Sequence, residues 1–381
     1  MLNFIMIKNR SKLEWNGEYG YQVYIKIMQE ENKMKVVTAI DSFKGSMTSM
    51  EAGFAAAEGI HRVDADAEVQ VRPLADGGEG TVEALVAGMN GKTEHVKVTG
   101  PLGEPVICEY GIIESTKTAV IEMAGAAGIT QVPDEKRNPL YTTTYGVGEV
   151  IRDAIEKGCR RFIVGIGGSA TNDGGVGMLQ ALGYAFLDKD GKQVLPGAGG
   201  LKDITEITDA YVIPELAECK FRVACDVTNP LCGELGCSVI YGPQKGATPE
   251  MIQDMDQWLG AYAEIAKERF PKADPKYPGT GAAGGMGFAF LTFTDAVLES
   301  GINIVLDETK LEDYIKNADF VITGEGRMDG QTAMGKAPVG VAKLAKKYGK
   351  KVIAFAGAVQ RDARAATMQG SMPFSRSSVE W

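Results

Sequence analysis

Charged side chains gather in five predicted loops, four of which contain glycine, and each loop directly follows a short, mostly apolar run. The segments cover residues 41–46, 75–80, 167–175, 226–229 and 324–329. They hold seven acids and two bases that could do chemistry: Asp41, Asp76, Glu79, Asp173, Asp226, Glu325, Asp329, Lys44 and Arg327. A plain phosphate site would avoid so many carboxylates, because like charges repel strongly at short range. Mg²⁺ that bridges carboxylates and phosphate oxygens removes this conflict, and a spare aspartate can then accept the proton of an attacking hydroxyl.

Alternating strands and helices are expected to position these segments. The strand-like runs 35–40, 69–74, 161–166, 320–323 and 352–356 are separated by helix-like stretches that include 81–89, 176–182 and 339–348. Thr48 and Glu51 have the spacing of a capping box, which predicts a helix start between the first two runs. This rhythm indicates an α/β fold with a parallel sheet. Ligands bind beyond the carboxyl ends of such strands, so the five segments should converge on one cleft.

The middle of the chain has a different pattern of predicted elements. Residues 106–113 and 118–123 predict antiparallel strands, and Thr248 followed by Pro249 predicts the start of a long helix. We therefore expect two α/β domains. One is built from residues 34–99 and 300–365, and the other is an inserted, mixed α/β domain of residues 100–299. Residues 1–33 are expected to be an extension outside the fold, and residues 366–381 an atypical tail without a helix or strand.

Composition excludes several classes of function. The chain has 381 residues and a net charge of −10. Sequence-independent binding of nucleic acid needs a basic surface, so this class of function is not expected. No run of 18 apolar residues exists, so no membrane span is expected. Two histidines leave little for a zinc site or a Ser-His-Asp triad, and six cysteines without a C-x-x-C pair are typical of a reduced, cytoplasmic protein.

Two alternative functions remain open at this point. Residues 165–170 match G-x-G-x-x-A after a strand, with Asp188 about 20 residues further on, which is the outline of a dinucleotide site. That outline favours an NAD(P)-dependent oxidoreductase of a small hydroxy acid, although residues 171–175 separate it from the following helix. A non-catalytic small-molecule binding protein would keep the cleft but would need no metal cluster.

Six strings in this order resemble the bacterial glycerate kinase type 1 family. They are DSFKGS (41–46), ADGGEGT (75–81), GIGGSATNDGG (165–175), ACDVTNPLCG (224–233), GPQKGA (242–247) and TGEGRMDGQT (323–332). The resemblance runs from Met34 to about Ala365. It implies a flavodoxin-like parallel-sheet domain made from both chain ends, an inserted α/β domain, and an active site in the cleft between them. It also implies transfer of the γ-phosphoryl group of ATP to D-glycerate with Mg²⁺, giving 2-phosphoglycerate or 3-phosphoglycerate.

The resemblance and the chemistry together suggest a role for each site residue. We expect Arg327, whose planar fork suits a carboxylate, to bind substrate together with Asp41, Ser42 and Asn229. Lys44 is expected to stabilise charge on the transferred phosphoryl group. Either Asp226 or Asp329 is expected to be the base, while the other helps to hold Mg²⁺. The expected nucleotide-binding residues are Gly167, Gly168, Ser169, Thr171, Asn172, Asp173 and Lys245, and the expected metal-binding residues are Asp76, Glu79 and Glu325. We expect no nucleic-acid or membrane partner and allow for a homodimer.

Overall fold

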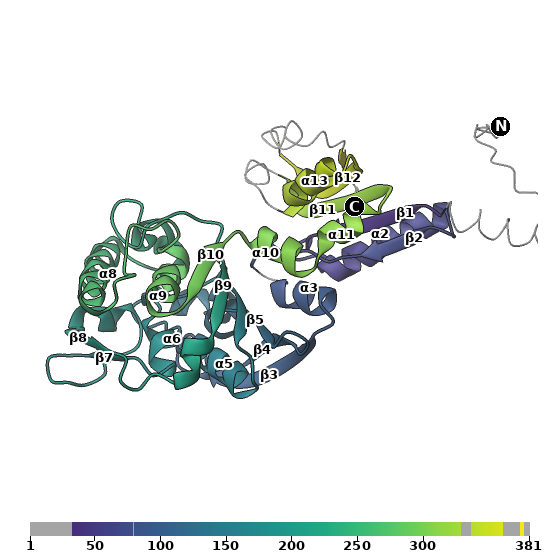
Figure 1. Cartoon of the computed structure of the whole chain (residues 1–381). Helices are drawn as coiled ribbons and strands as arrows, with labels where there is room; N and C mark the ends of the chain where they lie inside the picture. Colours follow the sequence, from purple (N-terminus) through teal and green to yellow (C-terminus); the bar gives the residue numbers. More distant parts are fainter. Residues whose placement is uncertain (1–32, 79, 329–336, 361–373, 377–381) are drawn as a thin grey trace, which may run out of the picture.

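Two α/β domains make up the computed structural model (Figure 1). The structure describes residues 33–78, 80–328, 337–360 and 374–376. The expected N-terminal extension therefore lies almost wholly outside the described residues, as do the predicted site residues Glu79 and Asp329. We call the two domains the parallel domain and the mixed domain, after their main sheets.

The parallel domain contains five strands in the order β13-β12-β11-β1-β2, all paired in parallel. The strands are β1 (Lys35–Ile40), β2 (Glu68–Val71), β11 (Phe320–Met328), β12 (Lys351–Val359) and β13 (Phe374–Arg376). Counted along the chain, this is the strand order 2-1-3-4-5 of flavodoxin-like folds. The associated helices are α2 (Ser49–Val63), α3 (Thr81–Gly88), α10 (Gly301–Glu308), α11 (Leu311–Lys316) and α13 (Ala337–Lys347). This confirms the expectation that strands from both ends of the chain form one parallel sheet.

Two sequence-based expectations about this sheet are wrong. Residues 324–328 are not a loop, because β11 continues through them and Glu325 and Arg327 pair with Ala356 and Ala358 of β12. The tail also contains a strand, because residues 374–376 pair with β12 at the sheet edge. Both errors arise because pairing with a neighbouring strand can hold a glycine-rich or polar sequence in the β conformation.

The mixed domain has a six-stranded sheet in the order β10-β9-β6-β5-β4-β3. Its strands are β3 (Lys92–Thr99), β4 (Pro105–Ile113), β5 (Thr118–Glu122), β6 (Arg161–Gly165), β9 (Lys220–Ala224) and β10 (Ala296–Glu299). The antiparallel pairing of β4 with β5 confirms the expected hairpin, whereas β5, β6, β9 and β10 run in parallel. β3 pairs with β4, so residues 92–99 belong to the sheet of the mixed domain. The chain therefore passes from the parallel sheet to the mixed sheet before Lys92, whereas the expected boundary lay after residue 99.

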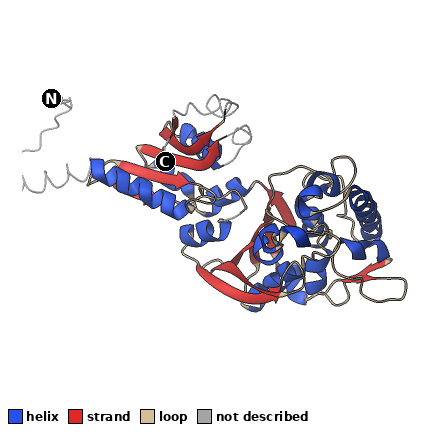
Figure 2. Cartoon of the chain, turned by 180° about the vertical axis from the view of Figure 1, so that it is seen from behind, coloured by secondary structure: helices blue, strands red, loops and turns tan. Residues whose placement is uncertain are grey.

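Shorter elements complete the mixed domain (Figures 1 and 2). A two-stranded sheet pairs β7 (Ala185–Leu187) with β8 (Glu206–Thr208). The helices are α4 (Ala124–Ala127), α5 (Tyr145–Glu156), α6 (Val176–Ala181), α7 (Cys237–Tyr241), α8 (Pro249–Arg269) and α9 (Met286–Phe293). The 3₁₀ segments are η1 (Ile129–Gln131), η2 (Asp134–Lys136), η3 (Ala198–Asp203), η4 (Pro214–Glu218), η5 (Pro243–Lys245) and η6 (Ala282–Gly284).

Both predicted helix starts are confirmed at atomic detail. Thr48 accepts a hydrogen bond from the N–H of Glu51, whose carboxylate accepts the N–H of Thr48 in return. Thr248 accepts from the N–H of Met251, and Pro249 occupies the first turn of α8. A side-chain cap of this kind contributes about 1 kcal/mol by satisfying amide groups that the helix leaves unpaired.

The two domains share a continuous apolar cluster. It joins Leu85 of α3 and Ile302 of α10 to Ile163 of β6, and it extends to the strands of the parallel sheet. Gly77 shows how closely the domains approach, because a Cβ placed there would lie 2.4 Å from the Cβ of Ala224 on β9. The loop after β2 is therefore packed directly against the mixed sheet. α3 and α10 lie between the two sheets in Figure 1.

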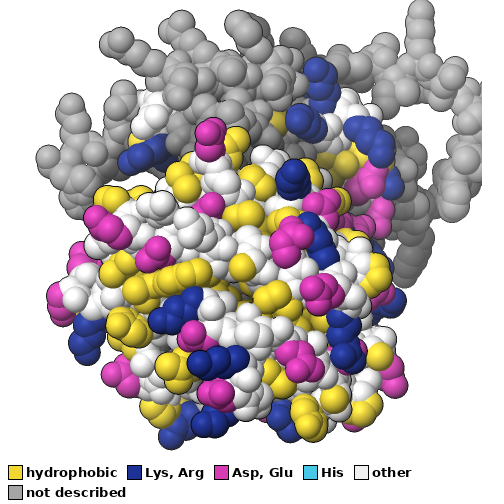
Figure 3. Space-filling view, turned by 90° about the vertical axis from the view of Figure 1, so that its left-hand side faces the viewer, with side chains coloured by type: hydrophobic (Ala, Val, Ile, Leu, Met, Phe, Trp, Pro, Cys, Tyr) yellow, Lys and Arg dark blue, Asp and Glu magenta, His cyan; other side chains and the backbone are white. Residues whose placement is uncertain are grey.

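The face of the mixed domain that carries α8, β7 and β8 is seen in Figure 3. Lysine and arginine side chains are interspersed there with aspartate and glutamate side chains, among scattered apolar groups. Such alternation keeps the electrostatic potential of a surface weak, because opposite charges cancel over short distances.

Candidate active site

The carboxyl ends of strands from both sheets border one cleft of about 700 Å³. The parallel domain contributes Lys44 after β1 and Asp76 with its neighbours after β2. The mixed domain contributes the ends of β5, β6 and β9. The lining residues that matter below are Lys44, Asp76, Gly77, Gly78, Glu122, Gly167, Gly168, Ser169, Asp226, Tyr241, Lys245, Ala282 and Ala283. Four of the five predicted segments therefore reach one cleft, as the carboxyl-end rule requires.

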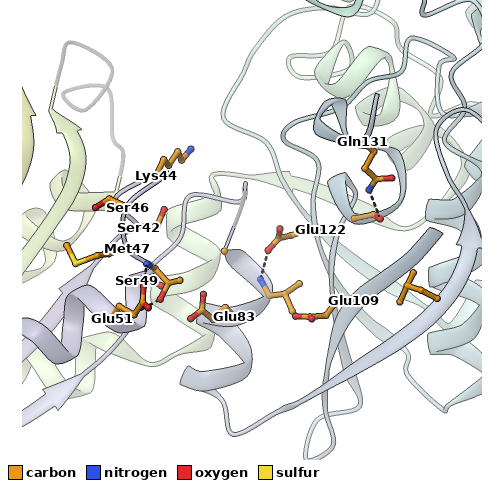
Figure 4. A pocket seen from close by; sticks show the side chains of 16 residues that line it. Ser42, Lys44, Ser46, Met47, Ser49, Glu51, Glu83, Glu109, Glu122 and Gln131 are labelled. Atoms are coloured by element: carbon orange, nitrogen blue, oxygen red, sulfur yellow. Dashed lines mark hydrogen bonds between the residues drawn. The ribbon is translucent and has the colours of Figure 1, made fainter. Parts of the chain in front are cut away.

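A second cavity of about 610 Å³ adjoins the first, and the two share Lys44, Glu122 and Gly125 (Figure 4). In Figure 4, Ser42 and Lys44 lie on one side, opposite Glu122, Glu109 and Gln131 on the other. Acidic side chains dominate this second cavity, which is lined by Glu51, Glu83, Glu109 and Glu122 with Lys44 as the lining cation among the described residues. An anionic substrate is therefore better accommodated in the larger cleft.

Gly167, Gly168 and Ser169 form the part of the predicted phosphate loop that borders the cleft. Gly168 has a φ of +73°, a conformation that side chains with a Cβ rarely adopt. Successive backbone N–H groups in a turn of this kind make a concave site for anions. The structure thus brings these three predicted residues to the lining of the larger cleft.

Thr171, Asn172 and Asp173 lie behind this loop and are fully buried. Asp173 accepts hydrogen bonds from the N–H and hydroxyl of Thr144 at 2.9 and 2.8 Å and from the N–H of Gly175 at 3.1 Å. Asn172 donates to the hydroxyl of Ser238 at 2.8 Å. These hydrogen bonds stabilise the conformation of the loop, and none of the three residues lines the cleft.

Asp226 follows β9 and exposes its side chain at the cleft. The N–H of Gly301, the first residue of α10, donates to its Oδ1 at 3.3 Å. A carboxylate at a helix N-terminus is stabilised by the helix dipole and by the unpaired amides of the first turn. Asp226 is thus a solvent-accessible acid in a defined orientation, as a general base must be.

The buried side chains of Asp41 and Glu325 and the half-buried Asp76 form an acidic group beside the end of β1, where β11 continues. Burial and the charges of Asp76 and Glu325 raise the pKa of Asp41 to about 7, against the opposing effects of the Ser42 N–H and of Lys44. Only Asp76 of the three lines the larger cleft. β1 and β11 flank the point where the strand order reverses, which is where ligands bind in folds of this order.

Two other predicted residues lie away from the cleft lining. Arg327 is exposed on β11 and lines neither cavity. The side chain of Asn229 accepts from the hydroxyl of Tyr241 at 2.7 Å and donates to the carbonyl of Leu235 at 2.9 Å, so it braces the loop after Asp226. Ser42 lines the second cavity, and its buried hydroxyl has no hydrogen-bond partner among the residues that the structure describes.

One wall of the cleft was missed by sequence reasoning. Ala282 and Ala283 belong to a glycine-rich turn at 279–287 that crosses the phosphate loop, where the N–H of Gly174 donates to the carbonyl of Gly284 at 2.9 Å. Ala283 has a φ of +52°, an uncommon conformation for alanine. The signal was the string GTGAAGGMG, but no strand precedes it, so the rule that identified the other segments did not apply.

Glu122 was missed as well. It ends β5, borders both cavities, and accepts the N–H of Val82 in the first turn of α3 at 2.8 Å (Figure 4). This hydrogen bond ties the mixed sheet to a helix between the domains. A single acid at the end of an apolar strand carries no sequence signal that distinguishes it from an ordinary surface residue.

Asp188, the acid that would complete a dinucleotide site with the G-x-G-x-x-A segment at 165–170, does not lie where such a site needs it. The Oδ1 of Asp188 accepts the N–H groups of Asp190 and Lys192 at 2.9 Å each, within the turn after β7. Asp188 is therefore engaged in a hairpin and does not line the cleft beside the G-x-G-x-x-A segment.

Among the described residues, no three His, Cys, Asp or Glu side chains converge as a ready-made metal site. Mg²⁺ nevertheless requires only one or two protein carboxylates when substrate phosphates supply further ligands. Asp76 and Asp226 border the same cleft and offer that donor set. No helix within the described ranges is long and apolar enough to cross a membrane.

Comparison with known proteins gives consistent matches over most of the chain. A model described as the glycerate kinase family matches residues 36–376. A glycerate kinase of Haemophilus influenzae is 52% identical over 329 residues, which cover 86% of this chain and 87% of that protein. A protein named glycerate 2-kinase from Escherichia coli is 50% identical over 329 residues, or 86% of each chain. The crystal structure of a protein assigned as glycerate kinase 2 in Salmonella typhimurium LT2 superposes with a TM-score of 0.82 at 46% identity, covering 89% of this chain and 95% of that one.

Proposed function

The chain belongs to the glycerate kinase family, and from this premise we propose that it transfers the γ-phosphoryl group of ATP to the 2-hydroxyl of D-glycerate. Kinase activity toward glycerate follows from the family, which also implies ATP as the donor. The choice of the 2-hydroxyl is supported by the name of the Escherichia coli relative, glycerate 2-kinase. The D-enantiomer is the one that the resemblance of the sequence motifs implies.

One observation carries the residue assignments within this proposal. The larger cleft combines backbone amides that suit phosphates, from Gly167 to Ser169, with the oriented carboxylate of Asp226. A nucleotide held by the loop would present its terminal phosphate toward the acids and Lys44 at the ends of the facing strands. Phosphoryl transfer needs mainly such positioning and charge stabilisation.

The following roles are assigned to residues of the cleft. Asp226 accepts the proton of the attacking hydroxyl, because its side chain is exposed at the cleft and oriented by α10. Asp329, the other expected base, lies outside the described residues. Lys44, which borders both cavities, offsets the charge of the transferred group. Arg327 and Ser42 remain proposed contacts for the carboxylate and hydroxyls of glycerate.

Mg²⁺ fits the acids at this edge of the two sheets. Burial raises the pKa of Asp41, and the charges of Asp76 and Glu325 raise it further; a nearby divalent cation would relieve the repulsion among these carboxylates. We assign the metal contact to Asp76, with Glu325 supporting it from β11. When bound, Mg²⁺ supplies charge neutralisation between phosphate oxygens.

The first test is release of ADP from ATP and Mg²⁺ with D-glycerate, with L-glycerate and with no acceptor. We expect release that depends on D-glycerate. In phosphorus NMR of the product, a phosphate on the 2-oxygen couples to one proton and gives a doublet, whereas a 3-phosphate couples to two and gives a triplet. A triplet would overturn the 2-hydroxyl assignment, and equal turnover with L-glycerate would overturn the stereochemical one.

The location proposed for the enzyme is the cytoplasm. All six cysteines lie within the described residues and all are free thiols. Free thiols persist where the compartment is reducing.

A further inference from the structure

Lys245 is a buried cation with few partners. It ends the 3₁₀ segment η5, and its side chain is 2% exposed. Its Nζ donates to the hydroxyl of Ser169 at 2.9 Å and to the carbonyl of Thr171 at 2.5 Å. An ammonium group carries three N–H donors, so one donor has no acceptor among the described residues.

No carboxylate of the described residues forms an ion pair with this ammonium. The titratable groups of the described residues whose charges act on this ammonium are Cys237 on α7 and Asp173 behind the loop. Asp173 is already engaged by Thr144 and Gly175, and the guanidinium of Arg137, whose backbone packs against Gly246, pairs with Asp134. Burying a charge without a counter-charge is costly. Burial accordingly lowers the pKa of Lys245 to about 8, although Cys237 and Asp173 act in the opposite direction.

The position of Lys245 identifies the missing counter-charge. It borders the larger cleft and donates to Ser169 and Thr171, which directly follow the Gly167–Gly168 turn at that cleft. An anion seated on this turn would lie beside the free N–H donor. Building on the proposed function, we propose that Lys245 is the buried counter-ion of the nucleotide phosphate chain, and that nucleotide binding completes the protonation of its amine with protons taken from solvent.

A purely structural lysine would behave differently. Its two hydrogen bonds to Ser169 and Thr171 hold the loop whether or not a nucleotide is present, so its protonation state would not change on binding. A counter-ion must become fully protonated in the complex, because a phosphate beside an ammonium raises the pKa of that ammonium. Proton uptake therefore distinguishes the two roles.

The experiment is calorimetric titration of the full chain with ATP, without glycerate, in Tris and in HEPES at pH 8 and pH 9. ATP itself is fully ionised in this range. We expect uptake of about half a proton at pH 8 and about 0.9 at pH 9, with binding about fivefold weaker at pH 9, as linkage requires for a group that titrates near pH 8. Tripolyphosphate should show the same uptake, because only the phosphate chain is involved. Heat that is independent of the buffer at both pH values would overturn the proposal.

Two variants and a control assign the proton to Lys245. Lys245→Met should bind ATP about 10–100-fold more weakly at pH 7, the value of a lost charge-assisted hydrogen bond, with no proton uptake. Lys245→Arg keeps a permanent charge, so the pH dependence between 8 and 9 should disappear. Lys189→Met, at an exposed lysine in the turn after β7, should retain the wild-type uptake. Uptake that persists in Lys245→Met would overturn the assignment, whereas uptake without ADP release on adding D-glycerate would count against the proposed function alone.

Discussion

Replacement of Asp226 by asparagine removes the proposed base while leaving its surroundings nearly unchanged. The amide oxygen of asparagine can still accept the N–H of Gly301, which lies 3.3 Å from Oδ1. The lost negative charge at the start of α10 costs about 0.3–1 kcal/mol, as expected for a helix dipole near the surface. For a chain of this size such a loss corresponds to a fall in Tm of only about 1–3 °C.

The expected loss of activity in Asp226→Asn is much larger. General base catalysis contributes about 10²–10⁴-fold to a rate, which corresponds to about 3–5 kcal/mol of transition-state stabilisation. We therefore expect kcat to fall by that factor at saturating ATP, D-glycerate and Mg²⁺, with both KM values changed far less. The assay is steady-state ADP formation, accompanied by thermal unfolding of the same preparation. Asp190→Asn, at an exposed acid of the turn after β7, is the matched control and should leave kcat unchanged.

Two results would refute the reasoning about Asp226. A kcat within about threefold of wild type, from a protein that unfolds normally, would remove this carboxylate from the proton transfer. Recovery of the wild-type kcat at high Mg²⁺ would mean that Asp226 acts by holding the metal, since added ion can offset a weakened site but cannot replace a base.

Three further changes test the packing and charge of the site. Gly77→Ala, with φ at +88° and its new Cβ 2.4 Å from that of Ala224, should lower the free energy of unfolding by about 2–4 kcal/mol in denaturant titrations. The control Gly103→Ala has φ at +87° but open space around the new Cβ, so it should lower the free energy of unfolding by only about 1 kcal/mol. Equal losses in the two variants would contradict the close approach of the domains. Because the pKa of Asp41 is raised when folded, its ionisation destabilises the protein progressively from about pH 4 to pH 7 and fully above pH 7. Asp41→Asn should therefore raise Tm at pH 8 and leave it unchanged near pH 4, and a uniform shift at both pH values would count against this. Lys44→Met should lower kcat about 10–10³-fold with little change in Tm, because its side chain is exposed; an unchanged kcat would exclude it from charge stabilisation.

The sequence contained enough information to predict the architecture. The alternation of strands and helices follows from hydrophobic periodicity, and the carboxyl-end rule then indicates where Lys44, Asp76 and Asp226 must lie. These positions depend on backbone topology alone. The predicted meeting of segments from both ends of the chain is confirmed for the same reason, since β1 and β11 are neighbours in the parallel sheet.

The direction of individual side chains could not be predicted in this way. Within GGSATND, the structure turns Gly168 and Ser169 toward the cleft and buries Asp173 behind it, although all belong to one string of the family motif. A tight turn reverses the direction of successive residues, and its exact dihedral angles depend on what packs beneath it. In this case that support comes from Thr144 and Lys245, which are distant in sequence.

Charge balance in the cleft links the separate assignments. Among the described residues, its lining contains the cations Lys44 and Lys245 and the acids Asp76, Glu122 and Asp226. ATP and glycerate add several more negative charges, so two lysines cannot neutralise the complex, and like charges in a confined cleft repel strongly. A divalent cation bound at Asp76, as proposed above, would supply the missing positive charge on the acidic side. As proposed above, the ammonium of Lys245 supplies positive charge beneath the phosphate loop, where no carboxylate of the described residues pairs with it, and the phosphates of the nucleotide complete its protonation.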